Sequence, residues 1–572
     1  MLTNSSLSAP ATRRASAFAG YKPLIWMSFI ALALRVCYMA TQTPVMSLDG
    51  SEYVRMAENL AAGKGLIGNF EGPETMYAPL FSVLTTGVCI VIKNAELAAH
   101  LVTLVFGTAL IIPVFFIALR MYGSRIAYLS AALVAFNPLF IALSASVYNE
   151  NVYLTLLLAA VYFGMRCLES HGSKDYMLLG VCLALGYMSR PEAFAYPAVF
   201  TVLVWGGVIF GRISTRQAML ATGLLVGTFL LVASPYISFL YAHTGQMRLE
   251  GKWNINYTIA NRIRSGMGYD EAAYGLGPGS GVAGPLLDPF RFASYTPYSH
   301  SLADKLQTLW AMAKRNRKEV SAELLSPTAG APLVLALALL GLFRKTWTLR
   351  RLVQELVVIG AVSSVLLFAV TASIIDFRYV LPAVALGLMW VAKGTDEACQ
   401  WVRSLVSTLN WRYLPNAHRT GAVVRVSLVL MVFGSVLYGV QTSGMFVTER
   451  EGFADLKQAG LWLRDLSPGP KKIACMGTVP TYYAKGTIIG LPYAESVQAL
   501  RYVDSQNVDF IFLDYHYTGN LPEAVDWIKH GIPDRRAHLI YSAGAPASRI
   551  AIYRWVSDAP SSPRPSATKN ST

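Results

Sequence analysis

Repeated apolar runs of membrane-spanning length constrain this chain more than any other feature of its sequence. Of its 572 residues, 54% are hydrophobic and only 14% are charged. Soluble globular proteins carry many more charges than this. One helical span of a bilayer requires about 20 apolar residues. The chain is therefore predicted to be a polytopic α-helical membrane protein.

About eleven runs are long enough to be such spans. They lie near residues 22–41, 99–119, 126–144, 151–167, 176–189, 193–211, 218–239, 331–347, 353–373, 379–393 and 422–443. The run Pro79–Ile92 is apolar but short. Counting it as a span would move four later basic clusters to the side opposite Arg13 and Arg14. We therefore expect it to form an interfacial or re-entrant helix at the outer surface.

The positions of the Lys and Arg residues predict the orientation and the domain boundaries. With Pro79–Ile92 left out of the spans, the basic clusters between spans fall on the side of the N-terminus, which is the cytoplasmic side. The expected order is a cytoplasmic tail (1–21), a membrane domain (22–444) with outer loops 42–98 and 240–328, a periplasmic or extracytoplasmic domain (445–557), and a disordered tail rich in Ser, Pro and Thr (558–572).

The C-terminal domain has the pattern of a small water-soluble α/β fold. Helical periodicity covers residues 452–465, 495–505 and 521–529, and β-rich runs cover 473–476, 510–513, 538–542 and 550–555. No catalytic motif is recognisable in this domain.

Charge and cysteine usage exclude several other classes of protein. The net charge is +15, but the basic residues occur between apolar runs and form no stripe for nucleic acid. The six cysteines are scattered, so neither a disulfide framework nor a cysteine metal site is expected. The eight histidines do not pair at ligand spacing. A divalent metal that joins Asp49 to Glu150 stays open.

An acidic segment, Ser47–Tyr53, follows the first predicted span. A carboxylate at the membrane surface suits proton transfer to or from a substrate whose tail stays in lipid. Asp49 also suits the N-cap of a surface helix over 49–62, with Glu52 three residues on as in a capping box. The two roles, cap and catalyst, are compatible because a capping carboxylate is rigidly held.

Further charged residues lie at the predicted outer ends of spans. Glu150 begins one span, where an acid also favours the helix dipole. Arg190 lies between two apolar runs, so it requires an acidic partner, Glu150 or Glu192, or a bound phosphate. Arg378 has the same two interpretations, with Asp376 as its nearest acid.

The order of several short motifs resembles the C-type glycosyltransferases that use polyprenyl-phosphate sugars, especially the bacterial branch related to protein O-mannosyltransferases and lipid A aminoarabinose transferases. The motifs begin at Asp49 (DGSEYVRMAENLAAGKG), Tyr77 (YAPLF), Tyr148 (YNEN), Ser189 (SRPE) and Phe377 (FRYVLP). The resemblance covers roughly residues 20–395. It implies that Asp49 and Glu150 are catalytic, and that the substrates are bound by Glu52, Tyr53, Arg55, Tyr77, Arg190, Glu192, Arg378 and Tyr379.

The resemblance implies a glycosyltransferase of the bacterial inner membrane that moves a sugar from a polyprenyl-phosphate donor to a glycan, lipid or protein acceptor on the periplasmic face. Asp49 would act as base in an inverting displacement. A transporter or flippase for a lipid-linked or anionic substrate is the alternative, and it predicts charges deep within spans and paired broken helices. A third interpretation, an assembly protein with a partner-binding periplasmic domain, leaves the Asp49 cluster without a role.

Overall fold

The computed structural model describes residues 9–42, 45–276, 284–290, 292, 301–326, 328, 331–409, 417–442, 448–545 and 549–556. The chain divides into two compact units, a helical unit (residues 1–66, 75–253 and 298–450) and a unit that contains the C-terminal domain (67–74, 254–297 and 451–572). Residues 558–572, the predicted disordered tail, lie outside the described residues.

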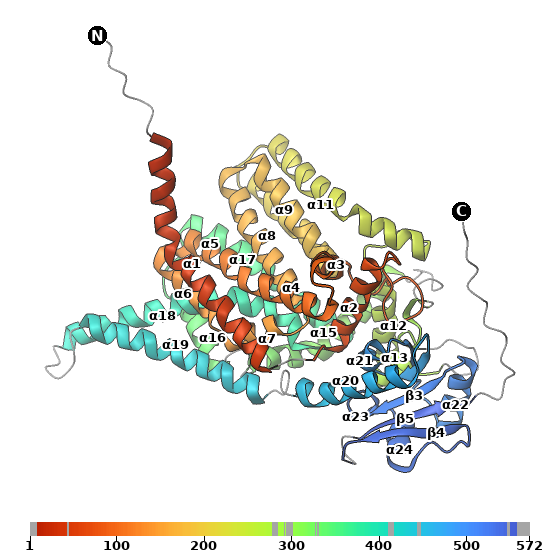
Figure 1. Ribbon diagram of the computed structural model, residues 1–572. Helices are drawn as coiled ribbons and strands as arrows, with labels where there is room; N and C mark the ends of the chain where they lie inside the picture. The colour runs from red at the N-terminus through yellow and green to blue at the C-terminus, as the bar shows by residue number, and fades with distance from the viewer. Residues whose placement is uncertain are drawn as a thin grey trace, which may run out of the picture. The chain divides into compact units, whose positions relative to one another are not determined.

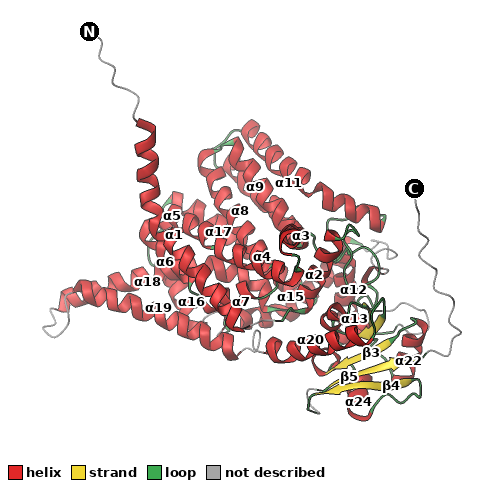
Figure 2. Cartoon of the chain, viewed as in Figure 1, coloured by secondary structure: helices red, strands yellow, loops and turns green. Residues whose placement is uncertain are grey.

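Long helices build the helical unit (Figures 1 and 2). They are α1 (Ala9–Gln42), α2 (Leu48–Ala61), α3 (Leu80–Ile92), α4 (Ala95–Ala109), α5 (Ile111–Tyr122), α6 (Ser124–Ala135), α7 (Pro138–Ala145), α8 (Glu150–Ser170), α9 (Ser173–Ser189), η1 (Pro191–Ala195), α10 (Tyr196–Ile209), α11 (Thr215–Thr244), α15 (Leu302–Leu324), α16 (Ala331–Phe343), α17 (Leu349–Thr371), η3 (Phe377–Val380), α18 (Leu381–Leu409) and α19 (Ala417–Thr442).

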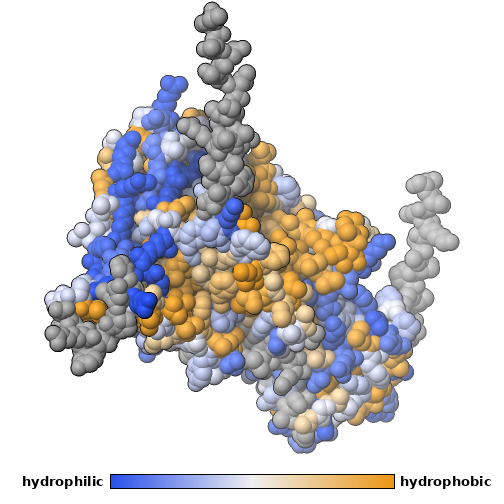
Figure 3. Space-filling model, turned by 60° about the vertical axis from the view of Figure 1, so that its left-hand side comes forward, coloured by the Kyte–Doolittle hydropathy of each residue, from blue (hydrophilic) through white to orange (hydrophobic). Residues whose placement is uncertain are grey.

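Helices occupy all eleven predicted ranges, which confirms the polytopic helical fold. Among the described residues, seven helices are long and apolar enough to cross a membrane, or eight if the bent pair α6 and α7 is one span. The number eleven therefore stays a prediction. Side chains such as Ile209 (82% exposed) and Leu231 (74% exposed) face outward, and Figure 3 shows apolar side chains, in orange, over much of this unit. Such a surface requires lipid around it.

The predicted span 126–144 is interrupted. Helices α6 and α7 meet at an angle of 51°, because Pro138 cannot donate to the α6 ladder and Asn137 caps α7 through the Leu139 amide. Arg35 of α1, which is fully buried, satisfies the carbonyl of Ala135 at the break, with its Nη1 donating at 2.8 Å. A guanidinium here replaces part of the interrupted main-chain hydrogen bonding.

Two glycines allow α16 and α18 to pack backbone against backbone. A Cβ added to Gly394 would lie 1.8 Å from the carbonyl oxygen of Leu337, and one added to Gly341 would lie 2.1 Å from that of Trp390. Small residues at such crossings permit the close approach that stabilises helix pairs in lipid.

The second unit carries a mixed five-stranded sheet (Figure 2). Its elements are α12 (Trp253–Arg264), α13 (Tyr269–Tyr274), α20 (Thr448–Leu466), β1 (Lys472–Cys475), α21 (Thr478–Tyr483), β2 (Thr487–Gly490), α22 (Ser496–Ser505), β3 (Phe510–Asp514), α23 (Tyr515–Thr518), α24 (Pro522–His530), β4 (Ala537–Ala543) and β5 (Ile550–Trp555).

The strand order is β2-β1-β3-β5-β4, with β1 parallel to β2 and β3, and with β5 antiparallel to β3 and β4. The apolar core contains the fully buried side chains of Trp527 and Leu513. The predicted α/β domain is thus confirmed as a fold, while the short strand β2 was not predicted.

Candidate active site

Asp49 lies in the first turn of α2. The N-cap of this helix is Ser47, whose side chain accepts a hydrogen bond from the Gly50 amide (3.1 Å). The prediction that Asp49 caps the helix is therefore wrong, because the helix begins one residue earlier. Among the described residues, the Asp49 carboxylate accepts no hydrogen bond from a main-chain amide. Its side chain keeps 28% of its surface exposed.

Two side chains from distant parts of the sequence hold the Asp49 carboxylate. The hydroxyl of Tyr77 donates to Oδ1 (2.9 Å), and Nη1 of Arg378 donates to Oδ2 (2.7 Å). Burial raises the pKa of Asp49, but the charges of Arg378 and Lys252, together with these two hydrogen bonds, hold the pKa well below its usual range. Asp49 is therefore ionised at neutral pH.

Arg378 links Asp49 to the second candidate acid. Its Nη1 lies 3.5 Å from Oε1 of Glu150, and its Nη2 lies 3.1 Å from Oδ2 of Asp376. Asp376 also accepts from the Arg378 amide at the start of η3, which fixes the local backbone. The predicted pair of Asp376 with Arg378 is therefore present, and the same guanidinium reaches both candidate catalytic carboxylates.

Glu150 is the first residue of α8 and is buried. Its Oε1 accepts from Nη1 of Arg190 (2.7 Å), whose Nε donates to Glu192 (2.7 Å). Both predicted acidic partners of Arg190 are thus engaged. Oε2 of Glu150 is buried and has no hydrogen-bond partner among the described residues. An unpaired buried carboxylate oxygen is costly unless a ligand donates to it.

Aromatic rings surround these charges. Arg190 lies over the rings of Tyr153 and Tyr379, with its Cζ 5.7 and 5.4 Å from the two centroids. Tyr53 contacts Tyr77 edge to face at 5.3 Å, and its hydroxyl accepts from Asn149 (2.6 Å). The structure therefore places Tyr53, Tyr77 and Tyr379 in the same cluster as these charges, and their role in binding substrate stays a prediction. Ring faces of this kind stabilise guanidinium groups within a partly buried site.

The two remaining predicted residues lie further along α2. Arg55 pairs with Glu58 of the same helix (3.8 Å). Glu52, one turn after Asp49, is fully buried. The α2 helix buries both faces over its first two turns, and Glu52 adds negative charge near Tyr77, as the raised pKa of Tyr77 reflects after the larger effects of burial and Asp49.

The segment after α11 contributes two charged residues that the sequence pattern did not single out. Nζ of Lys252 lies 4.2 Å from the centroid of the Tyr77 ring. Burial raises the pKa of Glu250 to about 7, with the charge of Glu192 in the same direction and that of Lys252 opposing. Gly251, between them, approaches the carbonyl of Thr75 so closely that a Cβ would lie 1.8 Å from its oxygen.

The residues do not fit a divalent metal bridging Asp49 and Glu150. The cation that lies between these carboxylates is the Arg378 guanidinium. Among the described residues, no group of three or more His, Cys, Asp or Glu side chains is arranged to hold a metal ion. A bridging ion would have to displace Arg378 from both acids.

Comparison with known proteins supports the same class of fold. Residues 76–239 match the family model described as dolichyl-phosphate-mannose-protein mannosyltransferase. The oligosaccharyltransferase of Archaeoglobus fulgidus superimposes with a TM-score of 0.56 at 13% identity, over 94% of this chain and 75% of its own. The ArnT protein of Cupriavidus metallidurans, bound to undecaprenyl phosphate, gives 0.53 at 13% identity, over 93% and 97%.

No curated protein sequence is significantly similar to this chain. At 13% identity the structural matches bear on the fold, and the family model covers the segment from Met76 to the last turns of α11. Together they confirm the resemblance predicted from the motifs: this multi-pass membrane protein has the fold of the C-type glycosyltransferases.

Proposed function

We propose that the protein is a membrane glycosyltransferase that transfers a sugar from a polyprenyl-phosphate donor to an acceptor hydroxyl or amine at the outer face of the membrane. The observation that carries the proposal is the ionised Asp49 carboxylate, held by Tyr77 and Arg378 beside the buried Glu150. Two carboxylates and two guanidiniums in one cluster supply what displacement of a phosphate requires, a proton acceptor and cations for the leaving group.

Asp49 has the capacity for a further hydrogen bond. A carboxylate has about four acceptor positions, and Tyr77 and Arg378 use one on each oxygen. With part of its surface exposed, Asp49 would accept the acceptor hydroxyl's hydrogen and take the proton as the oxygen attacks the anomeric carbon. The bond from that carbon to the phosphate oxygen breaks, and the lipid phosphate leaves with the electron pair.

The leaving phosphate would be held by cations that are not fully engaged. Nη2 of Arg190 has no hydrogen bond among the described residues, whereas its Nε and Nη1 pair with acids. Lys252 contacts the Tyr77 ring and has no ion pair in that part of the chain. Arg378 already bonds to two acids and is near a third. We therefore assign the donor phosphate to Arg190 and Lys252, with Arg378 chiefly positioning the carboxylates.

The unpartnered Oε2 of Glu150 gives the acceptor a second anchor. A hydroxyl or ammonium group that donates to it would remove the cost of a buried, unsatisfied oxygen. An acceptor bound between Glu150 and Asp49 would present its nucleophile on the side from which Asp49 takes the proton. A single displacement of this kind inverts the anomeric configuration.

The transporter alternative finds less support. It predicts paired broken helices and charges within spans. In the described part of the chain one span is broken, at α6 and α7, and the buried Arg35 within α1 is bonded to main-chain carbonyls and Ser144. This arginine holds the break and presents no group to a transported ligand.

The test is direct transfer by the purified protein. A set of polyprenyl-phosphate sugars, chosen after the head group of the co-purified lipid has been identified by mass, is incubated with candidate acceptors. The proposal expects release of polyprenyl phosphate that depends on an acceptor, and a product of inverted configuration. Retention of configuration would refute the single displacement, and flux of intact donor across vesicles without its cleavage would refute the transferase.

A further inference from the structure

A second polar region lies at the opposite ends of the helices that carry the candidate active site. Glu150 begins α8 and Glu169 lies one residue before its end, so a rise of 1.5 Å per residue places their main chains roughly 28 Å apart. Helix α17 runs in the opposite sense, with Arg350 in its first turn beside Glu169 and η3, which carries Arg378, after its end. This region is therefore separated from Asp49 by about the thickness of a membrane's hydrocarbon core.

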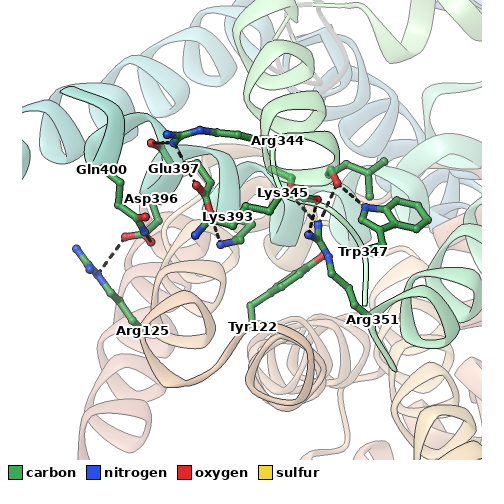
Figure 4. Close-up of polar contacts among 12 residues, drawn as sticks. Tyr122, Arg125, Arg344, Lys345, Trp347, Arg351, Lys393, Asp396, Glu397 and Gln400 are labelled. Atoms are coloured by element: carbon green, nitrogen blue, oxygen red, sulfur yellow. Dashed lines mark hydrogen bonds and ion pairs between the residues drawn. The ribbon is translucent and has the colours of Figure 1, made fainter. Parts of the chain in front are cut away.

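Most of the cations in this region pair with buried acids. Figure 4 shows Glu397 of α18 beside Arg344, Lys345 and Lys393, and Asp396 beside Arg125. Arg425 also reaches Asp396 (3.2 Å).

The acid of α17 is similarly engaged. Glu355 is fully buried, and it accepts from Arg351 (3.1 Å), Tyr122 (2.6 Å) and Trp390 (2.9 Å). Figure 4 shows the side chains of Arg351 and Tyr122 close to each other. These ion pairs join the ends of neighbouring helices. Their cations are not available for a ligand, because removing one would leave a buried acid unpaired.

Two arginines nearby are not committed in this way, and both line a cavity of about 610 Å³. Arg350 is 3.7 Å from Oε1 of Glu169 and its side chain is 72% exposed. Glu169 is already bonded to Arg120 (2.5 Å) and Gln354 (2.6 Å). Arg212, in the turn between α10 and α11, is exposed and has no side-chain hydrogen bond or ion pair among the described residues.

Apolar side chains also line the cavity, Met165 and Leu168 from α8 and Leu349, Val353 and Val357 from α17. Besides the two arginines, the other lining residues are Glu169, His171 and Gln354. The first turn of α17 also adds main-chain amides with the positive end of a 23-residue helix. Two guanidiniums and several apolar side chains in one cavity, at the end of membrane-length helices, match a phosphate with an acyl chain attached. The lining acid, Glu169, is engaged by Arg120 and Gln354.

We propose that this cavity binds an anionic phospholipid, with its phosphate between Arg212 and Arg350 and an acyl chain along the wall formed by Met165, Leu168, Val353 and Val357. The apolar wall favours a lipid over free phosphate, because a small anion would leave that wall uncovered. The site is independent of the proposed transfer reaction, since none of its residues belongs to the Asp49 cluster.

The test is lipid binding by the full-length protein in detergent, measured by native mass spectrometry. Phosphatidylglycerol and phosphatidylcholine with identical chains are titrated against the protein, and inorganic phosphate forms a separate arm. The double variant Arg212→Gln/Arg350→Gln removes the cations. Arg315→Gln/Arg317→Gln in α15 is the matched control, since both of its arginines are exposed and neither lines the cavity.

The proposal expects tighter binding of phosphatidylglycerol than of phosphatidylcholine, and a loss of about tenfold in that affinity for each guanidinium removed. The control variant should bind as the unaltered protein does. Val353→Trp, which fills the cavity but keeps both arginines, should also lose the lipid. Equal affinity for the two lipids, an equal loss in the control, or inorganic phosphate binding as tightly as phosphatidylglycerol would overturn the proposal.

Discussion

The hydrogen bond from Tyr77 to Asp49 allows a quantitative test of how the candidate base is held. Tyr77→Phe removes one hydroxyl and leaves the ring against Tyr53 and Lys252. Oδ1 of Asp49 then loses its donor at 2.9 Å, while Oδ2 keeps Arg378 at 2.7 Å. The carboxylate stays in place but is free to turn about one contact.

The expected loss follows from the strength of the bond. A hydrogen bond to a charged group contributes about 1.5–3 kcal/mol, which corresponds to a decrease of roughly tenfold to a hundredfold in transfer rate if the orientation of Asp49 matters fully in the transition state. Arg378 and Lys252 still lower the pKa of Asp49, so the carboxylate remains ionised at neutral pH. The change should therefore reduce kcat, while the acidic limb of the pH profile moves only slightly upward, because the Tyr77 hydrogen bond is a smaller cause of the low pKa than Arg378 and Lys252.

The assay is the initial rate of polyprenyl phosphate release at several pH values, with thermal stability recorded in parallel. Tyr176→Phe is the matched control, because its hydroxyl donates to the Cys167 carbonyl (3.3 Å) near the other end of α8. Its rate should match that of the unaltered protein. A decrease of less than twofold for Tyr77→Phe, or an equal decrease in both variants, would refute the positioning role.

Three further changes test other parts of the structure. Glu250, with a pKa of about 7 beside Lys252, gains negative charge as pH rises through neutrality, so donor binding should weaken there, and Glu250→Gln should abolish this step in a KM–pH profile. Asp514 is fully buried in β3, and burial raises its pKa from 3.8 to about 7. Ionisation of this carboxyl group therefore destabilises the folded state. The destabilisation is absent below the pKa of the unfolded chain and complete above about pH 7. Asp514→Asn should thus stabilise the C-terminal domain at pH 8 by up to about 4 kcal/mol, at about 1.4 kcal/mol per pKa unit, and by less at pH 5. Amide hydrogen exchange of the variant and the unaltered protein would measure both gains. An equal gain at the two pH values would contradict the raised pKa of Asp514. Gly394→Ala should lower the thermal unfolding temperature in detergent, because its Cβ meets the Leu337 carbonyl, whereas Gly387→Ala in the same helix, with nothing within 4 Å, should not.

The sequence was sufficient for the helices and for most of the C-terminal domain, because long apolar runs and 3.6-residue periodicity are local signals. The sequence was insufficient for predicting the hydrogen bonds of a charged side chain whose partners lie far along the chain. Arg35 was overlooked within the first apolar run, although a lone charge in such a run is itself a signal of a buried partner. Its partners are carbonyls about 100 residues away, at a break that Asn137–Pro138 marks in the sequence.

The candidate site shows the same limit. Asp49, Glu150, Arg190 and Arg378 were predicted from charges at span ends, and the structure brings them into one cluster. The pairs of Arg190 with Glu150 or Glu192 and of Arg378 with Asp376 were predicted from the sequence, whereas the contacts of Arg378 with Asp49 and Glu150 join distant segments and were not. Lys252 had no sequence signal, because it lies in a long loop without a motif and is positioned by packing against Tyr77.

The role of Asp49 is tested most directly by comparing Asp49→Asn with Asp376→Asn. Each change removes one carboxylate partner of Arg378, but only the first removes the proposed base. We expect Asp49→Asn to lower acceptor-dependent release of polyprenyl phosphate by roughly a hundredfold or more, with folding and donor binding retained, and Asp376→Asn to keep most of the activity. Transfer by Asp49→Asn at a rate within about tenfold of the unaltered protein, or an equal loss in both variants, would contradict that role.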